Sequence, residues 1–531
     1  MAGLRGFLYL EAGIVVHPRI RRCLTLLLIL LVGGCTAGPS ERPSVAVRDT
    51  NLPPQRPPLT PPRSPPLPPT GEYNRHSLPW RDCTGSISAA LGVPNPPRVE
   101  CAELRVDATA ATPAFGNVLK LDLSRVGAGP APLVVLGEAS GEPGTVRAAR
   151  LAQRLPPALL DRFTLIGLAR RGTGPSDPLD CIPNTTRNLI VGIDPDTDQP
   201  ERLDSLLDTT RTAIQTCVQD QGEVLTTINS PGTAEDLEQL RIILNAPVLN
   251  LISHGEASRS VTEFLHRYPS SAGRVVLDGA VDPTLDDVSA TEAEFLAADA
   301  GYTAFAADCV ARGCPLGADP RGALLALAEA LRRAPLRAGG QRVTAGIAYH
   351  AVLETVGDPE RWPRLSQALA AARDGNGAEL AELVAPVLAK DRGLPARFDP
   401  ALATRCNDTP TRVPPERAQQ LAHQWRQRSA LFGPLFAARL LWCSAWPVPS
   451  APPMEPEDQA LPPVLVVATT GDPVTPAEGA RRTAQSLPSA TLVSWQGPAH
   501  GALPRSACVV DLVTRFLMDA SIPRQGTLCP P

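Results

Sequence analysis

Short apolar runs alternate with helical patterns along most of this 531-residue chain, and this alternation constrains its fold more than any other feature. Most of the runs are continuously apolar, which is typical of strands buried on both faces of a parallel sheet. Between them lie stretches with helical spacing, such as AEDLEQLRIIL at 234–244. The alternation predicts an α/β domain with a mostly parallel, doubly wound sheet. The predicted strands are 119–126, 132–137, 163–169, 247–253, 274–281, 463–469 and 490–495.

The pattern changes between Pro283 and about Pro462, where the sequence becomes helical and rich in alanine. Examples are RGALLALAEALRRA at 321–334 and LSQALAAARDG at 365–375. We predict no parallel strand in this segment. Because the last two strands of the sheet follow it, we interpret it as a large helical lid, inserted over the carboxyl ends of the strands.

The first 35 residues have the pattern of an export signal. Arginines at 19, 21 and 22 precede an apolar run, 24–32, that is too short for a comfortable membrane span. The run ends in Val-Gly-Gly-Cys, which resembles a bacterial lipobox and makes Cys35 the predicted lipidation site. A plain signal peptide or a signal anchor is the alternative. We therefore expect an exported lipoprotein that faces the extracytoplasmic side of the cell membrane.

A proline-rich stretch follows the signal and peaks in PPQRPPLTPPRSPPLPP at 53–69. Such a composition does not bury a core, and it predicts an extended tether. A proline-rich recognition ligand is the alternative. Folded structure is expected to begin near Trp80. The predicted parts are a signal peptide at 1–35, a tether at 36–79, a first core part at 80–283, a lid at 284–455 and a second core part at 456–531.

Ten cysteines remain when Cys23 and Cys35 are set aside, and an even number in an exported chain suggests disulfides. Pairing between neighbours is the simplest choice, although the sequence alone leaves the connectivity open. No C-x-x-C motif or histidine cluster accompanies the cysteines, so we predict no metal and no cofactor. The net charge of −4, without a basic stripe, argues against a nucleic-acid partner. We expect a monomer. The neighbouring pairs would be 83–101, 181–217, 309–314, 406–443 and 508–529.

Several phrases occur in a specific order along the chain. They are FTLIGLARRGTGPSDPLDC (163–181), TAEDLEQLR (233–241), YPSSAGRVVLDGAVDP (268–283), CPLG (314–317), CSAWP (443–447), VLVVATTGDPVTP (464–476) and GPAHG (497–501). Together they resemble the secreted tripeptidyl aminopeptidase family, relatives of proline iminopeptidases within the α/β hydrolases. The resemblance covers about residues 80–530. It implies an α/β-hydrolase fold whose triad follows the order nucleophile, acid, histidine.

Two members of the triad match the family. Asp472 follows an apolar strand in GDPVTP, where the family keeps the acid that orients the histidine. His500 follows the next strand in AHG, where the family keeps the general base. The simpler alternatives are an aspartate that caps a turn and a histidine in a loop. The paired contexts favour the triad.

The nucleophile position departs from the family. Counting back fourteen places from Pro269, as the family spacing requires, leads to Gly255, with Ser253 and Ala257 at the places of the flanking glycines. Glycine offers no nucleophile, and it accepts a positive φ without steric cost. Because loss of a triad nucleophile removes roughly six powers of ten in turnover, we do not expect ordinary serine hydrolysis.

Two nearby hydroxyls are candidate surrogates. Ser258 lies in the first helical turn, where a capping role is the simpler interpretation. Ser253 lies at the end of the strand and should point to the opposite side of the turn. His254 and Glu256 form an H-x-E fragment, but the partner motif of a zinc deaminase is missing, so no metal site is predicted here.

The predicted oxyanion region also departs from the family. Relatives carry a G-G-P-G loop whose open backbone helps to bind the oxyanion, whereas this chain reads LGEASGEPG at 136–144. Glu138 and Glu142 intrude, and a carboxylate opposes an oxyanion, unless both face solvent. A further change is Ala169, where relatives usually have an aspartate. The residues expected to line the oxyanion region are Gly141, Gly144 and Glu256.

These departures predict a member of a hydrolase family that is catalytically impaired and binds peptides or small esters or amides. The alternative is an active serine exopeptidase or esterase that uses Ser253 or Ser258 with His500 and Asp472. A third hypothesis is an envelope scaffold that holds partners through the tether or the lid.

Overall fold

The computed structural model describes residues 68–93, 96–108, 118–194, 200–447 and 461–531. The predicted signal peptide, the predicted lipidation site Cys35 and most of the predicted tether lie outside the described residues. Among the described helices, none combines the length and the apolar character that a membrane crossing requires.

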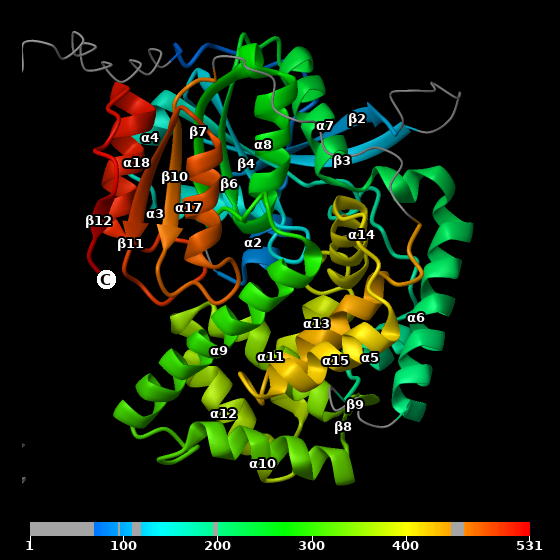
Figure 1. Cartoon of the computed structure of the whole chain (residues 1–531). Helices are drawn as coiled ribbons and strands as arrows, with labels where there is room; N and C mark the ends of the chain where they lie inside the picture. The colour runs from blue at the N-terminus through cyan, green and yellow to red at the C-terminus, as the bar shows by residue number, and fades with distance from the viewer. Residues whose placement is uncertain (1–67, 94–95, 109–117, 195–199, 448–460) are drawn as a thin grey trace, which may run out of the picture. The chain divides into compact units, whose positions relative to one another are not determined.

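A ten-stranded sheet forms the core, in the order β1-β2-β3-β5-β4-β6-β7-β10-β11-β12 (Figure 1). The strands from β5 to β12 in this order are parallel, and β1, β2 and β3 join them antiparallel at one edge. All seven predicted strands are present, and the predicted α/β-hydrolase fold is confirmed. The strands are β1 (Arg81–Asp82), β2 (Glu100–Asp107), β3 (Val118–Val126), β4 (Ala131–Leu136), β5 (Phe163–Leu168), β6 (Leu249–His254), β7 (Ala272–Asp278), β10 (Val464–Thr469), β11 (Ala490–Trp495) and β12 (Thr527–Cys529).

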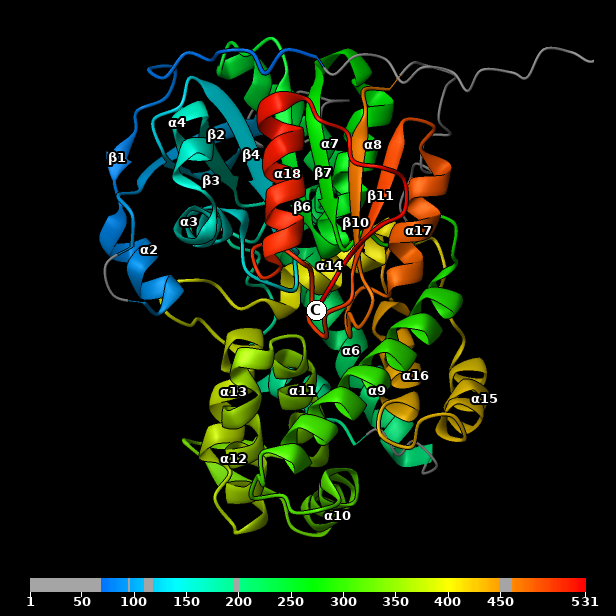
Figure 2. The same cartoon turned by 90° about the vertical axis from the view of Figure 1, so that its left-hand side faces the viewer.

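Helices cover both faces of the sheet, so the central strands are apolar on both sides. On one face, Val146 and Phe516 pack against strand residues such as Val467. On the other face, Leu237 and Phe264 belong to a second buried cluster. Figure 2 shows the same helices from a perpendicular direction. The helices of the first face are α2 (Thr84–Leu91), α3 (Gly144–Arg154), α4 (Pro157–Arg162) and α18 (Ala507–Asp519), and those of the second are α7 (Ser230–Ile243), α8 (Ser258–Arg267) and α17 (Ala477–Ser486).

The predicted lid is helical and gathers beyond the carboxyl ends of the parallel strands (Figures 1 and 2). It also holds a short antiparallel hairpin of β8 (Leu336–Ala338) and β9 (Gln341–Val343), which we did not predict. Two helices from the predicted first core part, α5 and α6, share the hydrophobic cluster of the lid, so the lid draws on two stretches of the chain. The helices are α5 (Asn184–Val191), α6 (Pro200–Gln221), α9 (Asp287–Ala311), α10 (Pro320–Arg333), α11 (Ala345–Val356), α12 (Trp362–Arg373), α13 (Ala378–Leu388), α14 (Phe398–Asp408), α15 (Pro415–Arg426) and α16 (Gly433–Arg439).

All five predicted disulfides are present, each between neighbouring cysteines. Cys181–Cys217 and Cys406–Cys443 cross-link the lid, and Cys508–Cys529 ties α18 to the last strand. Disulfides of this kind persist in oxidising compartments, which indicates that the protein works outside the cytoplasm.

A buried ion pair joins α5 to the start of α14. Arg187 donates to both carboxylate oxygens of Asp399 at 2.6 and 2.8 Å, and the same carboxylate accepts from the backbone N–H groups of Cys181 and Ile182 at 2.9 Å. Both side chains are almost completely buried. The pair therefore fixes one stretch of the lid to the other.

An Arg187→Met substitution should destabilise the protein by about 3 kcal/mol, because it leaves the Asp399 carboxylate buried without its charged partner. Arg211→Met is the matched control, since the pair between Arg211 and Asp208 is exposed and its loss should change stability by less than about 0.5 kcal/mol. Urea unfolding measures both effects. Equal midpoints for the two variants would contradict this role of the pair.

Candidate active site

The turn between β6 and α8 has the geometry of a nucleophile elbow. Gly255, the first residue after the strand, has a φ of 57°. This is the left-handed region of the backbone, which residues other than glycine adopt only under strain. In α/β hydrolases the nucleophile stands at this sharp turn between strand and helix. Gly255 therefore has the place and the backbone conformation expected of the elbow residue.

Asp472 and His500 meet beside this turn. Asp472 follows β10 and His500 follows β11, so both come from the carboxyl edge of the sheet. Nδ1 of His500 lies 3.0 and 3.1 Å from the two carboxylate oxygens of Asp472. The Asp472 carboxylate also accepts from the backbone N–H groups of Val474, Thr475 and Gly501. These bonds fix the carboxylate, and it in turn orients the imidazole.

Glu138 takes up the other side of the imidazole. It lies in the loop after β4 and is 6% exposed, and its Oε2 is 2.9 Å from Nε2 of His500. Its Oε1 accepts from the backbone N–H of Glu256 at 3.0 Å. A Cβ built on Gly255 would lie 1.9 Å from this Oε1. The Glu138 carboxylate thus occupies the space that a side chain at position 255 would need.

The charges of this cluster hold His500 in its protonated form. Burial disfavours the imidazolium, but the Asp472 and Glu138 carboxylates outweigh burial and raise the pKa of His500 well above its usual value. Burial also opposes the ionised form of Glu138, yet His500, the nearby His254 and the N–H of Glu256 together lower the pKa of Glu138 below its usual range. A general base needs a free lone pair at Nε2, and in this arrangement Nε2 is protonated and bonded to a carboxylate.

Carboxylates also occupy the backbone donors of the oxyanion region. In this fold the oxyanion is bound by the N–H after the nucleophile and by an N–H from the loop after the neighbouring strand. Here the first of these, the N–H of Glu256, donates to Glu138. The N–H of Ala139 donates to the Glu256 carboxylate at 3.2 Å, and Arg170 holds that carboxylate through two contacts of 2.8 Å. Neither donor is open to a substrate carbonyl.

Two of the predicted oxyanion residues lie elsewhere. The N–H of Gly141 donates to the carbonyl of Glu138 within the loop, at 3.3 Å. Gly144 begins α3, where a Cβ would lie 2.2 Å from the carbonyl oxygen of Leu168, so this glycine allows close packing of helix on strand. Of the three predicted residues only Glu256 presents its N–H at the elbow. The reason is that the loop after β4 turns Glu138, instead of a glycine backbone, toward His500.

Comparisons with known proteins find hydrolases. Residues 429–529 match the family model described as TAP-like protein. The sequence is 26% identical to serine protease Hip1 of Mycobacterium tuberculosis, over 75% of this chain and 80% of that protein. It is 24% identical to the tripeptidyl aminopeptidase of Streptomyces lividans, over 86% of this chain and 87% of that one. Residues 429–529 therefore carry the TAP-like family pattern, on a chain with the α/β-hydrolase fold.

Other comparisons add two proteins. The chain is 27% identical to carboxylesterase B of Mycobacterium tuberculosis, over 85% of this chain and 90% of that protein. Among solved structures, an α/β hydrolase fold protein from Nakamurella multipartita aligns with 79% of this chain and 100% of its own, at 14% identity and a TM-score of 0.32.

The two candidate surrogate hydroxyls are not bonded to His500. Oγ of Ser258 accepts from the backbone N–H of Val281 at 3.2 Å. Oγ of Ser253 is fully buried and has no hydrogen-bond partner within the part of the chain that the structure describes. The ring of His500 instead contacts Asp472, Glu138 and, at 3.4 Å, the hydroxyl of Thr475.

The lid closes over the oxyanion loop. Arg397 donates to the carbonyl of Ser140 at 3.0 Å, and it lies in the segment between α13 and α14. The cavity enclosed between this segment and Ala139 has a volume of about 20 Å³, roughly the room that one water molecule needs. A substrate would reach the elbow from this side only if the segment moved.

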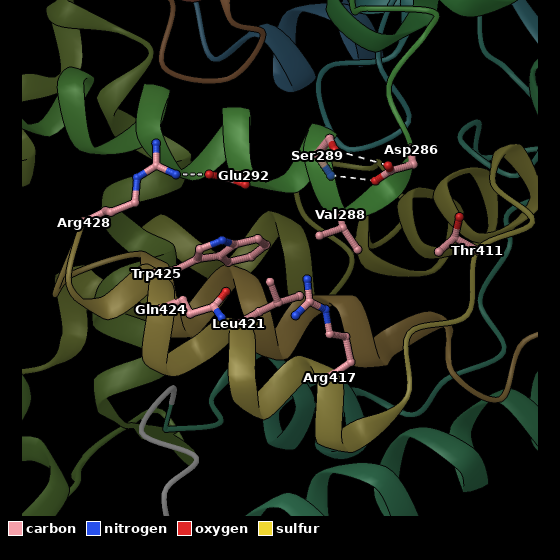
Figure 3. A pocket seen from close by; sticks show the side chains of 10 residues that line it. All are labelled: Asp286, Val288, Ser289, Glu292, Thr411, Arg417, Leu421, Gln424, Trp425 and Arg428. Carbon is pink, nitrogen blue, oxygen red and sulfur yellow. Dashed lines mark hydrogen bonds and ion pairs between the residues drawn. The ribbon is translucent and has the colours of Figure 1, made fainter.

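A larger groove of about 720 Å³ opens in the lid, between the start of α9 and α15 (Figure 3). Leu421 and Trp425 on α15 face Val288 on α9, and Figure 3 shows their side chains between the charged residues Arg417 and Arg428. The volume lies in the range of small-molecule sites, and the mixture of apolar and charged groups suits a short peptide.

Sequence reasoning left the role of Glu138 open. The available signal was a glutamate in a loop where relatives keep glycines, but the direction of its side chain depends on the fold of that loop. The same holds for Arg170, which neutralises Glu256 from the end of β5. Glu142, the other intruding carboxylate, pairs with Arg150 at 2.6 Å on a half-exposed surface and does not reach His500.

Proposed function

We propose that this TAP-like α/β hydrolase is catalytically impaired and acts by binding a peptide, or a small ester or amide, without forming an acyl-enzyme. In this proposal the protein is exported and anchored through a lipid on Cys35, and it acts as a monomer. The position of the Glu138 carboxylate carries the proposal. It fills the space of the missing nucleophile and occupies Nε2 of His500.

Serine hydrolysis needs a nucleophile, a general base and oxyanion donors, and none of the three is available in this site. Gly255 offers no hydroxyl to attack a carbonyl. His500, held as an imidazolium by two carboxylates, has no lone pair to take a proton. The donors that would bind the oxyanion are bonded to Glu138 and Glu256. Removal of one oxyanion donor alone lowers turnover by about 10²–10³, so together these changes support the loss of catalysis.

The ligand class follows from the relatives and from the lid groove. A serine protease, a tripeptidyl aminopeptidase and a carboxylesterase are among the similar proteins, and they suggest an amide or an ester. The groove between α9 and α15 presents an apolar floor with charged side chains of both signs at its edge, which suits a short peptide. We place ligand binding in this groove.

Hydrolysis and binding are measured separately to test the proposal. The purified protein should show no hydrolysis of tripeptidyl or aminoacyl chromogenic substrates that depends on His500. Turnover that His500→Ala abolishes would overturn the impaired-enzyme proposal.

Binding is measured by titrating the protein with tripeptides. The tryptophan fluorescence should change with peptide concentration and reach a plateau. Gln424→Trp, at an exposed position lining the groove, should weaken binding, whereas Gln427→Trp at the end of the same helix should not.

The alternative function is an active exopeptidase or esterase with a surrogate hydroxyl. One observation favours it, namely that the buried hydroxyl of Ser253 has no hydrogen-bond partner among the described residues and is therefore not committed elsewhere. This alternative requires Glu138 to leave Nε2 of His500. Turnover that disappears in both Ser253→Ala and His500→Ala would support it.

A further inference from the structure

Three potential metal ligands converge beside the glycine elbow. Glu138, His254 and His500 each offer a ligand atom, and these atoms all lie within 4.8 Å of one another. They come from the loop after β4, the end of β6 and the loop after β11, which all lie at the carboxyl edge of the sheet. Bonds from zinc to nitrogen and oxygen are about 2.0–2.2 Å long, so ligand atoms that share an ion lie about 3–4 Å apart. The cluster therefore needs only small movements to enclose an ion.

His254 is the least committed member of the cluster. It is 7% exposed, and its Nδ1 is buried without a hydrogen-bond partner among the residues that the structure describes. The Asp278 carboxylate is the acidic group opposite Nδ1, at 3.6 Å, which is beyond a hydrogen bond. The rings of His254 and His500 have their centroids 4.3 Å apart, at an angle of 46°. A cation bound at Nε2 would hold this ring with its Nδ1 toward Asp278.

The two histidines face carboxylates in the way that metal-bound histidines usually do. A metal-bound histidine usually gives its second ring nitrogen to a carboxylate, which fixes the ring and strengthens the ligand. Asp472 occupies this place for His500, at 3.0 Å from Nδ1, and leaves Nε2 as the ligand atom. Asp472 is itself held by three backbone N–H groups. Asp278 lies in the corresponding place for His254.

We propose that Glu138, His254 and His500 form a site for one divalent transition-metal ion, with zinc as the ion that fits best. Two imidazoles and one carboxylate are a donor set of zinc, and three protein ligands leave a fourth position for water or for a donor of the bound ligand. Calcium and magnesium prefer oxygen donors alone. Binding of the ion releases the proton on Nε2 of His500 to solvent. Two bonds to the ion then replace the direct contact between Glu138 and His500.

This site runs against the sequence prediction of no metal, for a physical reason. The H-x-E fragment suggested His254 and Glu256 as a pair, but Glu256 turns to Arg170 instead. The other two ligands stand 116 residues before and 246 residues after His254 in the sequence, at Glu138 and His500, and only the order of the strands brings them together. The proposal does not rest on the proposed function, since an inactive elbow exists with or without an ion.

Metal titration of the purified full-length protein, first stripped with a chelator, tests the site. Cobalt(II) should produce the visible absorption bands of a four-coordinate centre, and zinc should displace it with a stoichiometry of one ion. His254→Gln and Glu138→Gln should each weaken zinc binding by at least about 100-fold, and Asp472→Asn by about 10–100-fold. His350→Gln, at a buried histidine in the lid, is the matched control and should leave binding unchanged.

The proposal is overturned if the wild-type protein binds no zinc, or if His254→Gln binds as tightly as the wild type. Because a variant could fail to fold, X-ray absorption on the zinc-loaded wild-type protein provides a second measurement. It should show two imidazole ligands and the rest oxygen. A shell with sulfur, or with oxygen alone, would contradict the site.

Discussion

Gly255→Ser combined with Glu138→Gly is expected to give a working serine hydrolase, whereas Gly255→Ser alone is not. A Cβ at position 255 would lie 1.9 Å from Oε1 and 2.5 Å from Cδ of Glu138, so the single substitution meets a carboxylate that must move. Removing this carboxylate also frees Nε2 of His500 and the N–H of Glu256. Asp472 already orients the imidazole, so the remaining triad is in place.

The expected gain follows from two opposing effects. A triad nucleophile accounts for roughly six powers of ten in turnover. The N–H of Ala139 remains bonded to Glu256 in the double variant, and one missing oxyanion donor costs about two to three powers of ten. We therefore expect the double variant to exceed Gly255→Ser by roughly 10³-fold in kcat on tripeptidyl or ester substrates.

Two controls separate this explanation from a general loosening of the loop. Gly255→Ser with Glu142→Gly removes a carboxylate from the same loop that does not contact His500, and it should stay as inactive as the single variant. Adding His500→Ala to the active double variant should abolish the gain. Equal rates for the Glu138 and Glu142 combinations would show that Glu138 does not block the elbow.

His350→Gln is expected to reduce the loss of stability that the wild-type protein shows in acid. His350 lies on α11, is 6% exposed, and stacks on Trp442 with ring centroids 6.1 Å apart. Burial, helped by the nearby charge of Arg439, lowers the pKa of His350 to about 3 from the usual 6.5. The folded state therefore keeps this ring neutral at pH values where the unfolded chain protonates it.

The sign follows from proton linkage. Above pH 6.5 the ring is neutral in both states and contributes nothing to the pH dependence. Below pH 6.5 the ring binds a proton in the unfolded state but not in the folded state. The free energy of unfolding therefore falls by about 1.4 kcal/mol per pH unit until the pH nears 3. Between pH 6.5 and 4.5 the wild type should lose about 2–3 kcal/mol more than His350→Gln.

Urea unfolding at several pH values measures this difference. His423→Gln, which changes an exposed histidine on α15, serves as the control and should follow the wild-type curve. If His350→Gln and the wild type lose stability in parallel, His350 does not carry the acid sensitivity.

Much of the fold could be predicted because its strands are buried on both sides. Continuous apolar runs identify β4, β5 and β10 without ambiguity. The missed strands lack this signal. β2 alternates between buried and exposed residues at the edge of the sheet, and β1 and β12 have two and three residues. That α5 and α6 pack with the lid depends on long-range contacts that no local pattern reports.

The sequence predicted the site residues that lie in a motif, and it did not predict the role of those that lie outside one. Gly255, Asp472 and His500 stand at fixed places after strands, and the strand order brings them together. Glu138 lies in a loop, and sequence left two alternatives for it, a carboxylate at the oxyanion position or a side chain in solvent. In the structure the Glu138 side chain is buried beside His500, so it does not face solvent. Gly141 and Gly144 were misplaced because the loop after β4 folds around Glu138.

Intact-mass analysis after treatment with a fluorophosphonate probe tests the central claim, that an anionic side chain has taken the place of the nucleophile and locks its base. The wild-type protein should keep its mass, because no hydroxyl is activated. An adduct that maps to Ser253 or Ser258, and that disappears in His500→Ala, would contradict the claim.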